Sequence, residues 1–399
     1  MLDRLTVERV SAVAGEGPIL VALSGGGDSV ALLHLLTEAL GAARLHAVII
    51  DHALRDGSSV DAVRARELAE ALDLRAEIVT LNWPSGTKPA QASAREQRYR
   101  ALAVAARRIG ACVLVTGHTR DDQAETVLLR AARGSSWRGL AGMRVLTPAP
   151  IWPEGRGLWL ARPLLSARRE DLRARLRALG AEWIEDPANS NPDFARVRVR
   201  AVLAAAPFDP MRFAAIAERL APRVAALDDA AFDLIQRSVR VEADALIVDT
   251  SAWDVDPIVR ARALGVLLAA AGAQQRAAEF DPNQDITRPF NRAGALVRPT
   301  RGGLRLTRDP GALAGRADGA KPPPPLPLPE GQETVWDARL ALTAREPGWA
   351  VIVEGGAPVL ARGAERQSVP AANAYWLVQT RVAHLLGRIN DTKPCEVCD

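Results

Sequence analysis

Cysteine and lysine are both scarce in this chain of 399 residues. It contains three cysteines, Cys112, Cys395 and Cys398, and only three lysines, so arginine supplies nearly all of its 51 basic residues. So few cysteines exclude a disulfide-stapled secreted domain. Cys112 lies in an apolar run and is expected in the core. Cys395 and Cys398 form one CxxC pair, which is half of a zinc site at most, and we expect a reduced tail with no metal or redox role.

Long apolar runs are absent as well. No stretch of 18 apolar residues occurs, which excludes a membrane-spanning helix of ordinary length, and the first residues lack the apolar segment of a signal peptide. We therefore expect a cytoplasmic protein with no membrane contact. An apolar content of 48% predicts ample core for two or three domains. The net charge of +4 is modest and only weakly indicates a nucleic-acid partner.

What is present is a glycine-rich loop between a strand and a helix. Residues 19–23 are continuously apolar, residues 24–29 read Ser-Gly-Gly-Gly-Asp-Ser, and residues 30–40 return to helical spacing. A glycine-rich loop before a helix N-terminus forms an anion site, because free backbone N–H groups point outward there and the positive end of the helix dipole attracts negative charge. The Walker A lysine and the Rossmann spacing are both missing. Phosphate is predicted to contact Ser24, Gly25, Gly26, Gly27, Asp28 and Ser29.

Asp28 adds a second constraint. A carboxylate beside a phosphate is repulsive unless a cation lies between them, so Asp28 predicts bound Mg²⁺ and is the candidate metal ligand. Alternating segments follow this loop. Strands are predicted at 45–51, 76–81 and 112–116, and helices at 59–72, 92–109 and 120–132. This alternation predicts an α/β fold with a doubly wound parallel sheet, whose ligands lie beyond the carboxyl ends of the strands.

Polar residues at the end of the strand at 45–51 and on the helix at 92–109 each have two interpretations. Asp51 and His52 end the second strand, and they either cap it or line the nucleotide crevice. On the helix at 92–109, Arg95 shares a face with Arg98 and Tyr99. That face is either a solvated stripe or a site for nucleotide phosphates or RNA.

The helix at 120–132 begins with a group of acids. Asp121, Asp122 and Glu125 are favoured there by the helix dipole. Three carboxylates within five residues nevertheless repel one another unless a cation, such as an amine substrate or Mg²⁺, is present. The glycine-rich segment at 133–143 is either a linker or a lid over the site. The arginine-rich segments at 166–179 and 196–200 are predicted to neutralise phosphates.

Together these motifs resemble one family. The loop at 24–29 resembles the signature of the PP-loop ATP pyrophosphatases. With the DHALR segment at 51–55, AREQRY at 94–99, DDQAET at 121–126, RPLL at 162–165 and EDPAN at 185–189, the first half of the chain is similar to the tRNA(Ile)-lysidine synthetases. Departures from the family pattern fall at Thr119, Arg120, Ser136 and Val197.

The resemblance implies a two-step ligation. ATP adenylates the wobble cytidine of a tRNA(Ile) with a CAU anticodon and releases pyrophosphate, and free L-lysine then displaces AMP to give lysidine. ATP and Mg²⁺ are the implied cofactors, and a homodimer is left open. The implied nucleotide-binding residues are the loop at 24–29 with Asp51 and His52. The implied catalytic residues are Asp28, Arg95, Asp122 and Glu125, with Arg55 a further candidate for stabilising the α-phosphate.

The resemblance also divides the chain. It implies a PP-loop catalytic domain at 1–207, a helical tRNA-binding domain at 208–285, and a small β-rich region at 286–399 with a proline-rich linker at 321–329. Residues 210–273 have helical spacing throughout, a hairpin is expected at 296–306, and a helix is expected from Ala374. Another PP-loop enzyme, such as a tRNA thiolase, and a catalytically silent RNA-binding protein remain alternatives.

Overall fold

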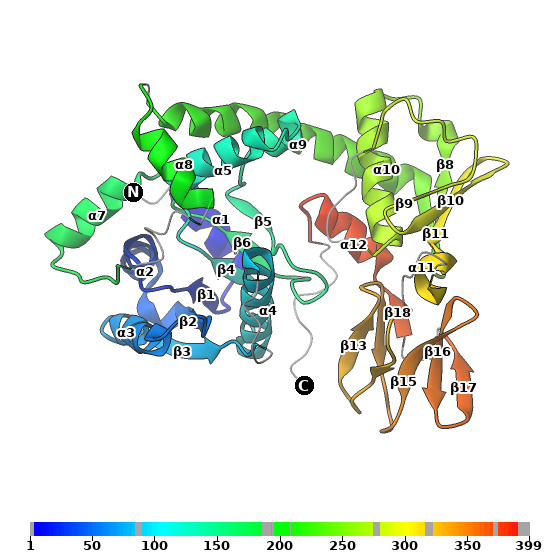
Figure 1. The fold of residues 1–399 in the computed structure, drawn as a ribbon, viewed down its shortest axis with the longest axis horizontal. Coiled ribbons are helices and arrows are strands. Elements are labelled where there is room, and N and C mark those ends of the chain that lie inside the picture. The colour runs from blue at the N-terminus through cyan, green and yellow to red at the C-terminus, as the bar shows by residue number, and fades with distance from the viewer. Residues whose placement is uncertain are drawn as a thin grey trace. The chain divides into compact units, whose positions relative to one another are not determined.

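A computed structural model describes most of the chain in two units (Figure 1). The described residues are 4–83, 90–185, 193, 195–207, 209–273, 280–315, 322–369 and 374–389. The two units divide between Val224 and Ala225, within helix α9 (Met211–Ser238). The boundaries expected at residues 207 and 285 remain predictions.

The first unit is built on a six-stranded sheet. Its strands are β1 (Ile19–Ala22), β2 (Leu45–Asp51), β3 (Arg75–Thr80), β4 (Val113–Val115), β5 (Leu146–Pro148) and β6 (Trp159–Ala161). Their order is β3-β2-β1-β4-β6-β5, and every neighbouring pair is parallel except β5 with β6. The predicted parallel sheet is therefore confirmed, with two further strands, β5 and β6, that the sequence pattern did not indicate.

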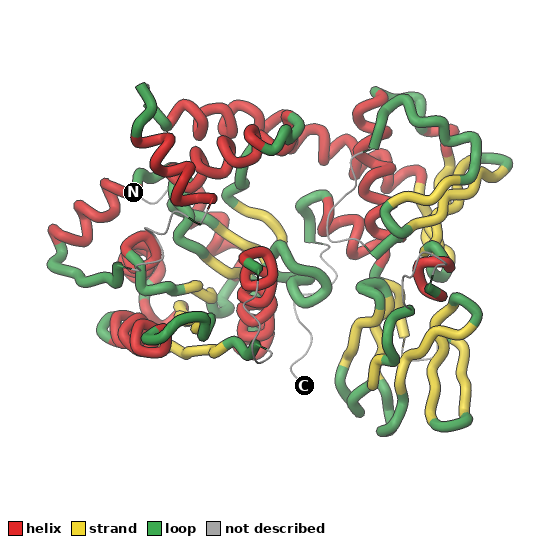
Figure 2. Tube along the Cα trace, viewed as in Figure 1, coloured by secondary structure: helices red, strands yellow, loops and turns green. Residues whose placement is uncertain are grey.

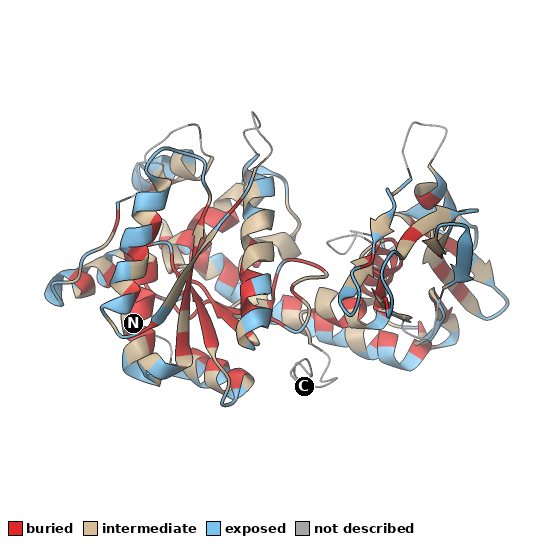
Figure 3. Cartoon of the chain, turned by 90° about the horizontal axis from the view of Figure 1, so that it is seen from below, coloured by how far each residue is buried: buried red, intermediate tan, exposed pale blue. Residues whose placement is uncertain are grey.

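Helices cover both faces of this sheet, as a doubly wound fold requires. Ile19 and Val21 of β1 face a core that includes α1 (Arg4–Ala14), α2 (Gly27–Leu40), α3 (Ser58–Glu70) and α7 (Arg169–Ala178). Leu20 and Ala22 face the opposite way, toward α4 (Gln91–Ile109). All four residues of β1 are buried because both of its faces are covered (Figure 3).

A further group of helices packs together in the first unit. It consists of α5 (Arg120–Ala132), the short α6 (Trp137–Leu140), α8 (Ala195–Ala204) and the first part of α9. Ala124 of α5, Leu203 of α8 and Ala214 of α9 meet in one apolar cluster. This packing places α8 against α5 and so brings the two helices' polar residues together.

The second unit differs from expectation where 210–273 was expected to be helical. Within that stretch lie α10 (Pro257–Ala271) and a hairpin of β7 (Val239–Glu242) and β8 (Ala245–Asp249). The hairpin turns through two residues, and Ala243 takes a φ of +54° there. β-Branched and apolar residues at alternate positions favour these strands, and the helical spacing on either side concealed them.

The hairpin belongs to a five-stranded antiparallel sheet, ordered β7-β8-β11-β10-β9. Strands are drawn in yellow in Figure 2. The other members are β9 (Phe290–Arg292), β10 (Ala295–Thr300) and β11 (Gly303–Arg308). The pairing of β10 with β11 confirms the hairpin expected at 296–306. Helix α10 is buried along most of its length and packs against α12 (Val378–Leu385) and this sheet.

The remaining strands form two smaller sheets. One contains β12 (Leu326–Pro327), β15 (Ala350–Glu354), β16 (Ala357–Arg362) and β17 (Glu365–Ser368), and the other β13 (Glu333–Trp336), β14 (Leu340–Thr343) and β18 (Ala374–Trp376). The short helix α11 spans Pro310–Ala314. The helix expected from Ala374 begins only at Val378, because residues 374–376 pair with β14. Part of the expected linker pairs as well, since β12 lies beside β15.

Candidate active site

The candidate active site is a polar cleft at the carboxyl ends of β1 and β4, which are adjacent in the sheet. The cleft has a volume of about 240 Å³. The loop after β1 and the loop after β4 line it, and four arginines project into it from α4, α7 and α8. These are Arg98, Arg169, Arg173 and Arg200.

The loop after β1 is held in shape by its own hydroxyls. The Ser29 hydroxyl donates to the Gly26 carbonyl oxygen at 2.8 Å and lies 3.0 Å from Ser24 Oγ. Gly25 has a φ of +79°, which favours glycine, and its carbonyl accepts the Ile184 N–H at 2.8 Å. The loop is therefore preformed at the N-terminus of α2, where the helix dipole attracts anions.

The loop after β4 comes very close to the same helix N-terminus. A Cβ on Gly117 would lie 2.9 Å from the Asp28 carbonyl oxygen, so glycine is needed at this crossing. Thr119 then caps α5, because its hydroxyl accepts the Asp122 N–H at 3.3 Å. In return Asp122 Oδ2 accepts the Thr119 N–H at 2.8 Å. One oxygen of Asp122 is thus used by the cap, and the other faces the cleft.

Arg169, the first residue of α7, joins the acidic residues of both loops. Its Nε donates to Asp28 Oδ2 at 2.8 Å, and its Nη2 donates to Asp122 Oδ1 at 3.0 Å. Its Nη1 is 3.5 Å from Glu125 Oε1, which also accepts from Arg200 Nε at 2.6 Å. We refer to these five residues as the Arg169 cluster. The predicted convergence of Asp28, Asp122 and Glu125 is found, and arginine supplies part of the cation that they require.

The Arg169 cluster is short of positive charge. Three carboxylates face two guanidinium groups, and both Asp28 Oδ1 and Glu125 Oε2 are buried without a hydrogen-bond partner. Burial raises the pKa of Asp28 despite Arg169. Burial also works to raise the pKa of Asp122, but the Arg169 guanidinium and the hydrogen bond from the Thr119 N–H outweigh it, and the pKa falls below the ordinary value. Asp28 Oδ1 and Glu125 Oε2 are therefore the two oxygens of the cluster at which a further cation can bind.

The fit of a magnesium ion rests on Asp28. Among the described residues, no group of three or more His, Cys, Asp or Glu side chains is arranged to hold a metal ion. Mg²⁺ in nucleotide sites uses only one or two carboxylates and takes its other ligands from phosphates and water. The free Oδ1 of Asp28, next to the phosphate-binding loop, fits that requirement.

His118 also lines the cleft. Its Nδ1 is 2.8 Å from the Thr116 hydroxyl. Burial, and next the Arg162 guanidinium, lower its pKa to about 3, so the ring is neutral at physiological pH.

Other predicted residues lie outside the cleft lining. Arg95 is exposed and its guanidinium lies 5.0 Å from the Tyr99 ring, whereas Arg98 lines the cleft. Asp51 is buried and its Oδ1 accepts the Ala53 N–H at 2.9 Å, which holds the turn after β2. The His52 carbonyl accepts the Trp83 indole N–H at 2.7 Å. Arg55 pairs with Asp61.

Some arginines have partners that the sequence did not indicate. Arg169 and Arg200 belong to segments predicted to neutralise phosphates, and in the structure both pair with carboxylates, while Arg175 pairs with Glu38. Phosphate neutralisation by these segments stays a prediction. No periodicity could have shown these pairs, because the partners lie in distant elements. The sequence held one indication of these pairs: the three carboxylates at the start of α5 repel one another and therefore require a nearby cation, which an arginine can supply.

The glycine-rich segment at 133–143 is ordered against α5. Arg130 Nη1 donates to the carbonyl oxygens of Gly139 and Gly142, at 2.7 and 2.9 Å. The Gln123 side chain exchanges two hydrogen bonds with the Met143 backbone. The segment therefore carries the short helix α6 and is not a simple linker.

Some predicted features lie outside the described residues. These are most of the EDPAN segment, namely Asp186 to Asn189, and the CxxC pair of Cys395 and Cys398. Glu185, the first residue of that segment, is described, and its Oε1 lies 3.5 Å from Arg173 Nη2. Among the described helices, none is both long enough and apolar enough to cross a membrane.

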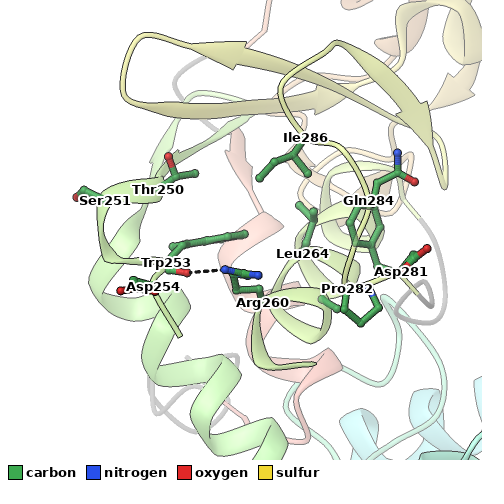
Figure 4. Close-up of a pocket in the computed structure, with 12 residues that line it drawn as sticks. Thr250, Ser251, Trp253, Asp254, Arg260, Leu264, Asp281, Pro282, Gln284 and Ile286 are labelled. Atoms are coloured by element: carbon green, nitrogen blue, oxygen red, sulfur yellow. Dashed lines mark hydrogen bonds between the residues drawn. The ribbon is translucent and has the colours of Figure 1, made fainter. Parts of the chain in front are cut away.

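A larger hollow lies in the second unit, with a volume of about 450 Å³. Trp253, Leu264 and Ile286 give it apolar walls, and Arg260 Nη1 lies 3.4 Å from the Trp253 carbonyl oxygen (Figure 4). None of the residues predicted to act in nucleotide binding or catalysis lines it. Size alone therefore does not identify the reactive site of this protein.

Comparison with known proteins agrees with the site geometry. Residues 3–206 match a family model described as a PP-loop domain. A tRNA(Ile)-lysidine synthase of Hyphomonas neptunium is 37% identical over 329 residues, which cover 82% of this chain and 86% of the relative. Another, from Salinispora tropica, is 40% identical and covers 76% and 92%, and a third, from Rhizobium meliloti, is 35% identical and covers 84% and 75%.

Proposed function

This chain belongs to the tRNA(Ile)-lysidine synthases, which are PP-loop enzymes, and from that premise we propose how its cleft performs the ligation. The enzyme is an ATP-using ligase that joins lysine to tRNA(Ile). The proposed details are adenylation of the wobble cytidine in a CAU anticodon, release of pyrophosphate, and displacement of AMP by the ε-amine of lysine. A tRNA thiolase is not favoured, because the relatives are lysidine synthases.

One observation carries the proposal. The phosphate-binding loop at 24–29 and Asp122 of α5 line a single cleft, and Arg169 bridges Asp28 to Asp122 and to Glu125, which is buried beside them. A nucleotide and an amine held in these two places would be neighbours. Holding both reactants in one cleft favours the ligation, because the activated base and the amine are then already close enough to react.

The nucleotide side is built from the loop and the cleft arginines. We propose that the backbone of residues 24–29 binds the β and γ phosphates at the N-terminus of α2. When bound at Asp28, Mg²⁺ supplies positive charge that offsets the phosphates and the leaving pyrophosphate. Arg98 and Arg173 line the cleft and would pair with phosphate oxygens. We therefore move the role expected for Arg95 to Arg98, and we retain Asp51 and His52 as candidates for contacting the nucleoside.

The amine side is built from Asp122 and Glu125. The ammonium group of lysine needs a carboxylate that binds it. It must also lose a proton before it can attack, so the site needs a base that accepts this proton. The lowered pKa of Asp122 keeps this group ionised and suits it to binding the ammonium. Glu125 has a buried oxygen without a partner, and we propose that this Oε2 accepts the proton.

The substrates also bear on the rest of the chain. We propose that the arginine-rich segments at 166–179 and 196–200 contact the anticodon arm, and that residues 208–285 and 286–399 contact other parts of the tRNA. Because tRNA, ATP and free lysine are together in the cytoplasm, we place the enzyme there. A homodimer stays open as a proposal.

The test is mass analysis of nucleosides from a tRNA(Ile) transcript with a CAU anticodon. After incubation with the protein, ATP, Mg²⁺ and L-lysine, we expect lysidine in place of one cytidine, with equal amounts of AMP and pyrophosphate. A transcript with uridine at the wobble position is the matched control and should remain unmodified. ADP instead of AMP would contradict the proposal, a thiolated nucleoside formed when sulfide is added in place of lysine would favour the thiolase, and absence of pyrophosphate would favour a silent binder.

A further inference from the structure

Arg169 occupies the position where the nucleotide side and the amine side of the cleft meet. Its three guanidinium nitrogens contact Asp28 on one side and Asp122 and Glu125 on the other. The side chain is 20% exposed, so it can be reached from the cleft. Resting on the function proposed above, we propose that Arg169 is a positioning residue that makes lysine binding depend on bound nucleotide.

The backbone of Arg169 is anchored while its side chain is free to change partners. Its N–H donates to Asp121 Oδ2 at 2.8 Å, which fixes the start of α7 beside α5. The guanidinium itself is held only through ion pairs with groups that a ligand would also engage. A change of partner therefore needs rotation of one side chain and no movement of a helix.

In the protein without ligands, Arg169 competes with lysine. It takes one oxygen each of Asp122 and Glu125, the carboxylates that an ammonium would use. Two cations that share the same carboxylates exclude each other, in part by repulsion. Arg169 thus occupies part of the site proposed for the amine.

Nucleotide at the loop would shift Arg169 away from the amine site. A metal ion on Asp28 competes with Arg169 for this carboxylate. Phosphate oxygens next to the loop also attract the guanidinium, because arginine forms charge-assisted hydrogen bonds with phosphate. Both effects draw Arg169 toward the nucleotide. Its departure frees Asp122 Oδ1 and leaves Glu125 with Arg200 as its remaining partner. Lysine then binds more tightly, and by linkage lysine also strengthens nucleotide binding.

This coupling places the amine site under control of the first reaction step. Lysine binds well only when nucleotide is present, so the amine enters the cleft after the nucleotide. The alternative is a static brace, in which Arg169 joins α2, α5 and α7 but keeps its partners throughout. A brace predicts lower stability without Arg169 and no change in the coupling.

The experiment measures binding of labelled L-lysine by equilibrium dialysis to the protein with its tRNA(Ile) transcript. It is done with and without Mg²⁺ and an ATP analogue that has a methylene bridge between the α and β phosphorus atoms. For the wild type, nucleotide should lower the Kd of lysine by about 5- to 150-fold, the usual range of such coupling. In Arg169→Gln the two Kd values should agree within about twofold, as expected for coupling near zero.

Arg175→Gln is the matched control, because Arg175 lies on the same helix and pairs with Glu38 away from the cleft. It should keep the wild-type coupling. Arg169→Lys retains the charge but not the three-way contact, so it tests the coupling if the glutamine variant fails to fold. Wild-type coupling in either Arg169 variant overturns the proposal, as does lysine binding in the wild type that is absent or independent of nucleotide. Lysidine formed by a wild type without coupling would refute this inference alone and leave the proposed function intact.

Discussion

Arg169 in the first unit and Arg262 in the second both bind carboxylates inside the protein, but their surroundings differ. Arg262 Nε donates to Asp228 Oδ1 at 2.7 Å and its Nη2 donates to the Leu385 carbonyl at 3.1 Å. Arg262 and Asp228 are both buried, and their charges cancel. Arg169 faces three carboxylates, and the Arg169 cluster keeps one negative charge in excess.

This difference separates a structural ion pair from a site prepared for a ligand. The Arg262–Asp228 pair ties α9 to α10 and, through Leu385, to α12, and it leaves no charge for a ligand to neutralise. In the Arg169 cluster, two buried carboxylate oxygens have no hydrogen-bond partner. Native proteins seldom leave such atoms unpaired unless water, an ion or a substrate completes them. Four predictions test this contrast, beginning with the largest expected effect.

Asp28→Ala should abolish the ligation while leaving the fold intact. The change removes the proposed metal ligand beside the phosphates, and turnover should fall by about 10³-fold or more. Stability should change little, because Arg169 keeps Asp122 and Glu125 as partners. Pyrophosphate release with tRNA and lysine measures the activity, and thermal unfolding provides the control. Near-normal activity would remove the metal role of Asp28.

Asp228→Ala should lower the stability of the protein and not its activity, the reverse of what is expected for Asp28→Ala. It leaves the Arg262 guanidinium buried without its anion, which costs about 3–5 kcal/mol in the free energy of unfolding. The active cleft should be unaffected wherever the first unit remains folded. Urea unfolding followed by circular dichroism measures the loss, and the double variant Arg262→Met/Asp228→Leu should recover most of it. A loss smaller than about 1 kcal/mol would class this pair with exposed ion pairs.

His118 should make the first unit sensitive to acid. Its folded-state pKa of about 3 lies below the value of 6.5 expected when unfolded. Between these values the unfolded chain takes up a proton that the folded chain does not, so stability is lost as pH falls through 6.5. The loss is at most about 2 kcal/mol between pH 7 and 5.

His118→Gln should reduce that loss, as measured by urea unfolding at both pH values. Part of the pH dependence should persist in the variant, because burial also lowers the pKa of His34, His46 and His52. Identical pH dependence in the variant and the wild type would show that His118 is protonated in the folded cleft.

The sequence predicted those features that depend on neighbours along the chain. The strand, glycine loop and helix around Asp28, and the acidic start of α5, are local patterns, and parallel pairing brings the ends of β1 and β4 together. Arg169 could not be assigned in this way, because its partners come from α2 and α5 and are separated from it by 141 and 47 residues. The same holds for β5 and β6, which are three residues each and too short to show a period.

Helix α4 shows a different limit. The sequence placed Arg95, Arg98 and Tyr99 on one face, but it could not say how the helix turns against the sheet. Tyr99 and Leu102 are buried in the core, and this orientation directs Arg98 into the cleft while Arg95 remains exposed. Packing and not spacing thus decides which arginine of this helix lines the cleft.

The smallest effect is expected at Glu38, whose partner Arg175 lies on α7 with Arg169. Glu38 is 67% exposed and Arg175 is 34% exposed, so water screens the pair. Apolar residues including Leu33, Leu36, Leu172 and Leu176 share the core between α2 and α7. Glu38→Gln should therefore lower the free energy of unfolding by less than about 1 kcal/mol, with a smaller loss at high salt. Urea unfolding at two salt concentrations measures this, and a larger, salt-independent loss would mean that helix α7 depends on its ion pairs for attachment, the Arg169 cluster included.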